Sequence, residues 1–131
     1  MNYWKKGCNH LLQCDPVFKK YYNPKHQLKT NKNKFDVLFK SICSQQISVS
    51  AAMSIYKNSK HIIGPINFTN FTNNKNKIKK LPLSNNKKKC LFSLLENYHL
   101  VSKIKLNENS FEKVNKDLTQ IFGIGRWTAE M

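Results

Sequence analysis

Residues 121–130 read IFGIGRWTAE, and this stretch decides the fold of the second half of the chain. Gly123 and Gly125 permit a tight turn, because a glycine adopts positive φ without a steric penalty. A helical pattern ends before them, and a new helix is expected from Trp127. The residues leave two interpretations open. One is a plain corner between two helices, and the other is a hairpin that offers backbone N–H groups to a phosphate.

Upstream of this turn, apolar residues recur at helical spacing. The clearest stripe begins at Phe35 and predicts a helix that breaks at residues 44–46. Ser48 is the expected N-cap of a second helix, and Ser84 that of a third. A fourth helix is expected to begin with Asn109 as N-cap and Glu112 as its capping-box partner.

The remaining segments complete an all-α prediction. Asp15-Pro16 predicts a helix start, residues 27–34 a polar linker, and residues 61–80 a loop with at most one weak helix. No stretch alternates apolar and polar residues for long enough to predict a strand. We therefore expect one helical domain over 1–131, with N-terminal helices and a linker in 1–34 and a helical region in 35–131 that ends in a hairpin near 111–131.

The composition indicates a polyanionic partner. The 131-residue chain has 23 basic and 7 acidic side chains, a formal net charge of +16. Nucleic acid is the first candidate and an anionic membrane surface the second. A second explanation is open, since Arg126 is the only arginine and lysine and asparagine share A-rich codons. The bias of an AT-rich genome would then supply part of the charge.

The cysteines and the N-terminus predict a protein of the cytosol. Cys8, Cys14, Cys43 and Cys90 contain no CxxC pair, so neither a zinc site nor an iron–sulfur cluster is expected. Residues 1–7 contain no apolar signal region, and no run is long enough to span a membrane. We expect a monomer that is cytoplasmic and nucleoid-associated, neither secreted nor bound to a membrane.

The flanks of the two glycines resemble the helix-hairpin-helix motif of base-excision DNA glycosylases (HhH-GPD superfamily). That family has a Leu-Pro-Gly-Ile-Gly-like hairpin, and its DNA-3-methyladenine glycosylase II branch continues with Trp-Thr-Ala-Glu-Met. This chain keeps all but the proline, which is Phe122. The segments 38–52, with Gln45-Gln46, and 83–89, with Leu83-Ser84, also resemble the family in order and separation.

The resemblance implies roles for individual residues. DNA contacts are assigned to Gly123, Gly125, Arg126, Gln46, Ser84 and Lys87. Gln46 takes the position of the side chain that wedges into the duplex where the damaged base leaves; the alternative is a surface or capping glutamine. Trp127 and Met131 match lining residues of the base pocket, although a core tryptophan is the alternative for Trp127. No cofactor is implied beyond a structural Na⁺ or K⁺ on the backbone carbonyls of Thr119, Ile121 and Ile124.

The implied activity is hydrolysis of the N-glycosidic bond of alkylated purines in double-stranded DNA, with the damaged nucleotide flipped from the stack. The family uses an aspartate that corresponds to a position beyond Met131, where this chain ends. We therefore expect a domain incomplete at its C-terminus and inactive by itself. The alternatives are a non-catalytic basic DNA-binding helical protein that uses the hairpin alone, and an RNA-associated protein favoured by charge only.

Overall fold

A computed structural model of the chain describes residues 3–23, 31–105 and 110–130. All the regular elements in these ranges are helices, and no strand occurs within them, which confirms the all-α prediction. The chain divides into two compact units, Met1–Asn31 and Lys32–Met131. Within the described ranges no helix has the length and apolar character needed to cross a membrane.

The first unit consists of α1 (Tyr3–Cys14) and α2 (Phe18–Tyr21). The helix predicted after Asp15-Pro16 is a single turn, which starts at Phe18. Asp15 supports the turn before it, because its Oδ1 accepts the N–H of Val17 at 2.9 Å. No described side chain of this unit is buried.

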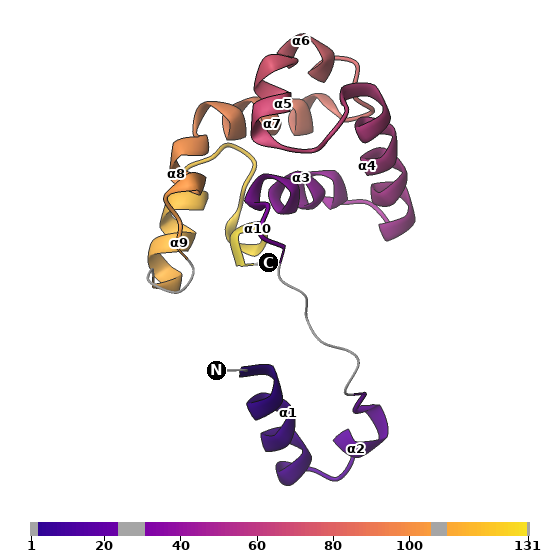
Figure 1. Ribbon diagram of the computed structural model, residues 1–131, viewed down its shortest axis with the longest axis vertical. Coiled ribbons are helices and arrows are strands. Elements are labelled where there is room, and N and C mark those ends of the chain that lie inside the picture. The colour runs from indigo at the N-terminus through magenta and orange to yellow at the C-terminus, as the bar shows by residue number, and fades with distance from the viewer. Residues whose placement is uncertain (1–2, 24–30, 106–109, 131) are drawn as a thin grey trace. The chain divides into compact units, whose positions relative to one another are not determined.

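The second unit is built around α3 (Lys34–Ser44), whose predicted apolar stripe is buried in full. The stripe comprises Phe35, Leu38, Phe39, Ile42 and Cys43. Asn33 caps the helix by accepting the N–H of Asp36 at 3.1 Å. In Figure 1 α3 lies at the centre of this unit, in contact with α4 (Val49–Ile63), α7 (Asn85–Glu96) and α8 (Tyr98–Ser102).

The predictions for the helix starts at residues 48 and 84 are confirmed. The Ser48 hydroxyl accepts the N–H of Ala51, and the Ser84 hydroxyl accepts that of Lys87. The cap of α9 (Phe111–Leu118) is Ser110, which accepts the N–H of Lys113, so the capping box with Glu112 was wrong. Asn109, the expected cap, lies outside the described residues.

The interpretation of residues 61–80 as a loop with at most one weak helix was also wrong. The segment contains the end of α4, α5 (Phe68–Asn73) and α6 (Lys75–Ile78). Phe71 and Ile78 are completely buried in the core, so tertiary burial outweighs the weak local propensity of an Asn- and Lys-rich sequence.

Candidate nucleic-acid interface

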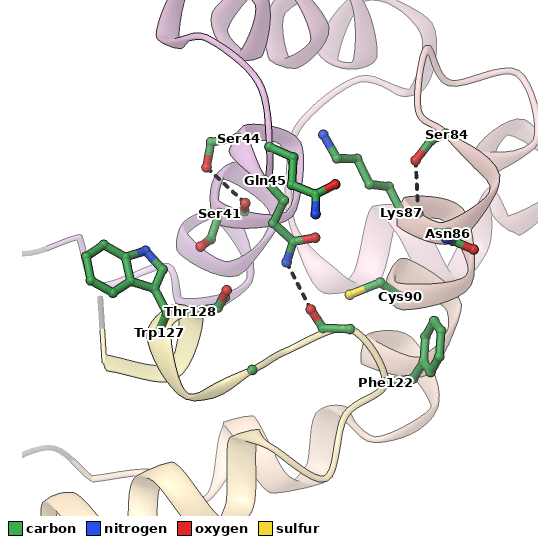
Figure 2. Close-up of a pocket in the computed structure, with 13 residues that line it drawn as sticks. Ser41, Ser44, Gln45, Ser84, Asn86, Lys87, Cys90, Phe122, Trp127 and Thr128 are labelled. Carbon is green, nitrogen blue, oxygen red and sulfur yellow. Dashed lines mark hydrogen bonds between the residues drawn. The ribbon is translucent and has the colours of Figure 1, made fainter.

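The end of α3, the start of α7 and the glycine hairpin surround an open pocket of about 610 Å³ (Figure 2). α3 and the loop after it supply Ser41, Ser44, Gln45 and Gln46; α7 and its cap supply Ser84, Asn86, Lys87 and Cys90; the hairpin and α10 (Arg126–Glu130) supply Phe122, Gly123, Gly125, Trp127 and Thr128. The structure thus brings together residues that are up to 87 positions apart in the sequence, from Ser41 to Thr128.

Six of the residues selected from the sequence line this pocket: Gln46, Ser84, Lys87, Gly123, Gly125 and Trp127. Arg126 is not among the lining residues, and Met131 lies outside the described residues. No single segment of the sequence predicts that these residues lie together. It follows from the fold, which places the three similar segments around one opening.

Gly123 is exposed and lines the pocket, but it also packs closely against Cys90 of α7. Its φ of 80° belongs to the left-handed region, and a Cβ built on it would lie 2.8 Å from both Cβ and Sγ of Cys90. Real Cβ atoms essentially never approach that closely, so any side chain here requires Cys90 to move. The residue is a glycine because of both conformation and packing.

Gly125 lines the same pocket but has no close neighbour. A Cβ built on Gly125 meets no heavy atom within 4 Å, and the residue is exposed at the pocket. No neighbour among the described residues therefore requires a glycine at this position. A close approach by a ligand to the backbone is a physical reason for one.

Two side chains, for which the sequence predicted no role, form hydrogen bonds with the hairpin. The hydroxyl of Ser93, on α7, accepts the N–H of Phe122 at 3.0 Å. The Nε2 of Gln45 donates to the carbonyl of Gly123 at 2.9 Å (Figure 2). A proline, which the similar family has at the position of Phe122, possesses no N–H. The departure to Phe122 therefore provides a hydrogen bond that proline lacks.

Gln46 has a backbone conformation that is unusual for its residue type. Its φ is 58°, the only positive value among the described non-glycine residues. Left-handed backbone costs roughly 1–2 kcal/mol for a residue with a Cβ. Such conformations persist where the surroundings hold them, and they concentrate at functional sites.

Lys87 joins α7 to the end of α3. Its Nζ donates to the carbonyl of Cys43 at 2.8 Å, where a cation is favourable beside the unpaired carbonyls of a helix C-terminus. An ammonium group has three donors, so this bond leaves capacity for a further acceptor at the pocket.

Trp127 is not a core residue, since 77% of it is exposed. Phe122 is 56% exposed on the same hairpin. In the view of Figure 2 the two rings lie on different sides of the hairpin segment. The indole is thus available as a stacking surface at the pocket.

The side chain of Arg126 is engaged elsewhere. Its Nε donates to Oε1 of Glu130 at 2.6 Å, and the same oxygen accepts from Nδ2 of Asn115 at 3.3 Å. The hydrogen bond from Arg126 lowers the pKa of the Glu130 carboxyl and raises that of the guanidinium. Both groups are at the surface, so the pair adds little stability.

The two thiols near the hairpin are inert. Burial raises the pKa of Cys43 to about 12, although the charge of Lys87 opposes the shift. Burial also raises the pKa of Cys90 to about 11. Both remain protonated at neutral pH and pack as small apolar groups, as the sequence predicted.

The described residues offer little for a metal ion. No group of three His, Cys, Asp or Glu side chains within them is suitable for one. The proposed alkali site uses carbonyl oxygens alone, which are hard donors appropriate to Na⁺ or K⁺. The Ile121 carbonyl already accepts the N–H of Ile124 at 3.0 Å, which leaves it one lone pair. The cation on Thr119, Ile121 and Ile124 stays a prediction.

The chain matches no protein-family profile, and no curated protein sequence matches it. Among solved structures it is similar to the DNA-3-methyladenine glycosidase from Bacillus halodurans, with a TM-score of 0.68 and 28% sequence identity. The superposition covers 81% of this chain and 51% of the glycosidase. This chain therefore spans about half the length of that protein.

Proposed function

We propose that this chain, which belongs to the helix-hairpin-helix base-excision DNA glycosylase superfamily, binds duplex DNA and receives an alkylated purine in its pocket, as a DNA-3-methyladenine glycosylase II-like protein. The observation that carries the proposal is the convergence of the hairpin, an exposed indole and Gln46 on one opening.

The phosphate contact is assigned to the hairpin. Gly125 leaves open space where a Cβ would project, so a phosphate can approach the backbone N–H groups. Lys87 lies at the same pocket and adds a positive charge. The net charge of +16 supports association with a polyanion along the rest of the surface.

The base contact is assigned to Trp127. An alkylated purine carries a positive charge, which an electron-rich indole face attracts. With 77% of Trp127 exposed, stacking requires no rearrangement of the core. Gln46, already in a left-handed conformation at the rim, would fill the gap that the flipped nucleotide leaves in the duplex.

The reaction breaks the N-glycosidic bond. Its electron pair leaves with the base and neutralises the positive charge, while the oxygen of water bonds to the sugar carbon and loses a proton. A carboxylate is needed to stabilise the cationic sugar. None of the described residues that line the pocket is acidic. We therefore propose that residues 1–131 bind and unstack the damaged nucleotide but do not release the base.

A second candidate follows from the same observation. A pocket whose described lining contains no carboxylate also suits a non-catalytic DNA-binding protein that uses the hairpin alone. Such a protein would bind duplex DNA through phosphates and would not distinguish damaged from intact sites.

Titration of the chain against two duplexes of identical sequence, one intact and one with a tetrahydrofuran abasic analogue, tests the proposal. We expect affinity for both to fall steeply with salt, by about 10³ between about 50 and 200 mM if about six phosphates are neutralised. We also expect tighter binding to the abasic duplex, because an unpaired site is easier to distort.

The controls separate the candidates. Equal affinity for the two duplexes would exclude flipping and leave the non-catalytic protein. A flat salt dependence would exclude phosphate binding as a whole. Release of free 3-methyladenine from alkylated DNA by residues 1–131 would show that a carboxylate outside the described lining, first of all Asp117 or Glu130, performs the chemistry.

A further inference from the structure

Gln45 connects two parts of the pocket that are far apart in the sequence. It lies half-buried in the turn between α3 and α4, and its Nε2 donates to the Gly123 carbonyl, 78 residues away (Figure 2). A hydrogen bond to a neutral carbonyl adds only modest stability. The bond is important because it holds the peptide group between Gly123 and Ile124.

The peptide between Gly123 and Ile124 is held at both ends. Its carbonyl oxygen accepts from Gln45 at 2.9 Å, and its N–H donates to the Ile121 carbonyl at 3.0 Å. Since the peptide group is planar, two bonds at opposite ends fix its orientation. The contact of Gly123 with Cys90 limits movement on the remaining side. The fixed orientation of this peptide therefore limits the positions that the next residues, including Gly125 at the pocket, can adopt.

Gln45 is also the residue directly before Gln46. The positive φ of Gln46 sets the direction of its side chain relative to the Gln45 backbone. A movement of the Gln45 backbone, in contrast to a change of its side-chain rotamer alone, would alter both its bond to the hairpin and the direction of Gln46. The loop and the hairpin are thus linked through one amide.

We propose that Gln45 is a positioning residue that couples Gln46 to the hairpin, so that phosphate binding at the hairpin and insertion of Gln46 into the duplex occur as one event. This inference rests on the proposed function of the pocket. The proposal assigns Gln45 no part in the chemistry, although it lines the pocket; its role is to act through Gln46.

A double-mutant cycle tests the coupling. Gln45→Met keeps the length of the side chain and removes the donor, and Gln46→Ala removes the inserting side chain. The measured quantity is the ratio of affinities for the abasic-analogue and intact duplexes. We expect each single variant to lower the ratio about tenfold, and the double variant to be no lower than Gln46→Ala alone.

Gln120→Met is the matched control. Gln120 also donates its Nε2 to a backbone carbonyl, that of Lys116 at 3.2 Å, but it lies exposed at the end of α9 and does not line the pocket. The same substitution there should leave the ratio unchanged. Gln45→Glu, which has no donor at neutral pH, supplies a second variant if Gln45→Met folds poorly.

The outcomes are distinct. If Gln45→Met keeps the wild-type ratio, or if its effect adds in full to that of Gln46→Ala, the coupling is refuted while the proposed function stands. If the wild-type chain has no preference for the abasic duplex, the proposed function fails and the coupling fails with it. A lower melting temperature with an unchanged ratio would assign Gln45 a structural role only.

Discussion

The inner and outer sides of the hairpin differ in what their residues contact. On the inner side Ile121 and Ile124 are buried, and Gly123, although it is exposed at the pocket, lies against Cys90. On the outer side Gly125 and Trp127 are exposed at the pocket, and neither is required by the core. Residues one or two positions apart in the hairpin thus serve different purposes. Packing against Cys90 requires a glycine at position 123, whereas the approach of a ligand is the reason for a glycine at position 125.

The largest expected effect is on the inner side. Gly123→Val places a β-branched residue at φ 80° and a Cβ 2.8 Å from Cys90. We expect the free energy of unfolding to fall by about 3 kcal/mol or more, since backbone strain and overpacking add. Thermal denaturation measures this. A melting temperature equal to that of the wild type would remove the distinction between the two sides.

The same substitution on the outer side should affect binding instead. Gly125→Val meets open space, so we expect the free energy of unfolding to change by less than about 1 kcal/mol. The new side chain stands where a phosphate would approach, and we expect a loss of duplex affinity of about tenfold, the equivalent of one hydrogen bond to a charged group. If Gly125→Val binds DNA as well as the wild type, the hairpin is a plain corner between two helices.

The smallest expected effect concerns the hydrogen bond from the N–H of Phe122 to Ser93, which a proline at position 122 could not form. Ser93→Ala removes the acceptor for the N–H of Phe122 at 3.0 Å. We expect a loss of about 1 kcal/mol in unfolding free energy, because this N–H is exposed enough to turn to water. Chemical denaturation measures the unfolding free energy of Ser93→Ala, and a titration with duplex DNA measures its affinity as the control. A loss of binding that exceeds the loss of stability would show that Ser93 belongs functionally to the outer side.

The features predicted from sequence are those that depend on residues close in the chain. The α3 stripe and the Ser48 and Ser84 caps need only three- and four-residue spacing. The short helices α5 and α6 were not predicted, because the burial of Phe71 and Ile78 by distant elements stabilises them and leaves no local signal in the sequence. The bond from Gln45 to Gly123 had no local signal at all. The DNA contacts selected from the sequence remain predictions, although five of those six residues line one pocket.

The asparagines of the second unit restrict which nucleotide changes the gene tolerates. Asn67 caps α5, and Asn70 donates its Nδ2 to the carbonyls of Ile63 at 2.7 Å and Pro65 at 2.9 Å. Each asparagine codon is one base from a lysine codon, and a lysine ammonium cannot accept the backbone N–H that a cap requires. Mutations that exchange asparagine and lysine freely on the surface would therefore be selected against at a cap such as Asn67. Asparagine-to-lysine substitutions would therefore accumulate, and raise the net charge, only at positions where the asparagine side chain does not cap a helix.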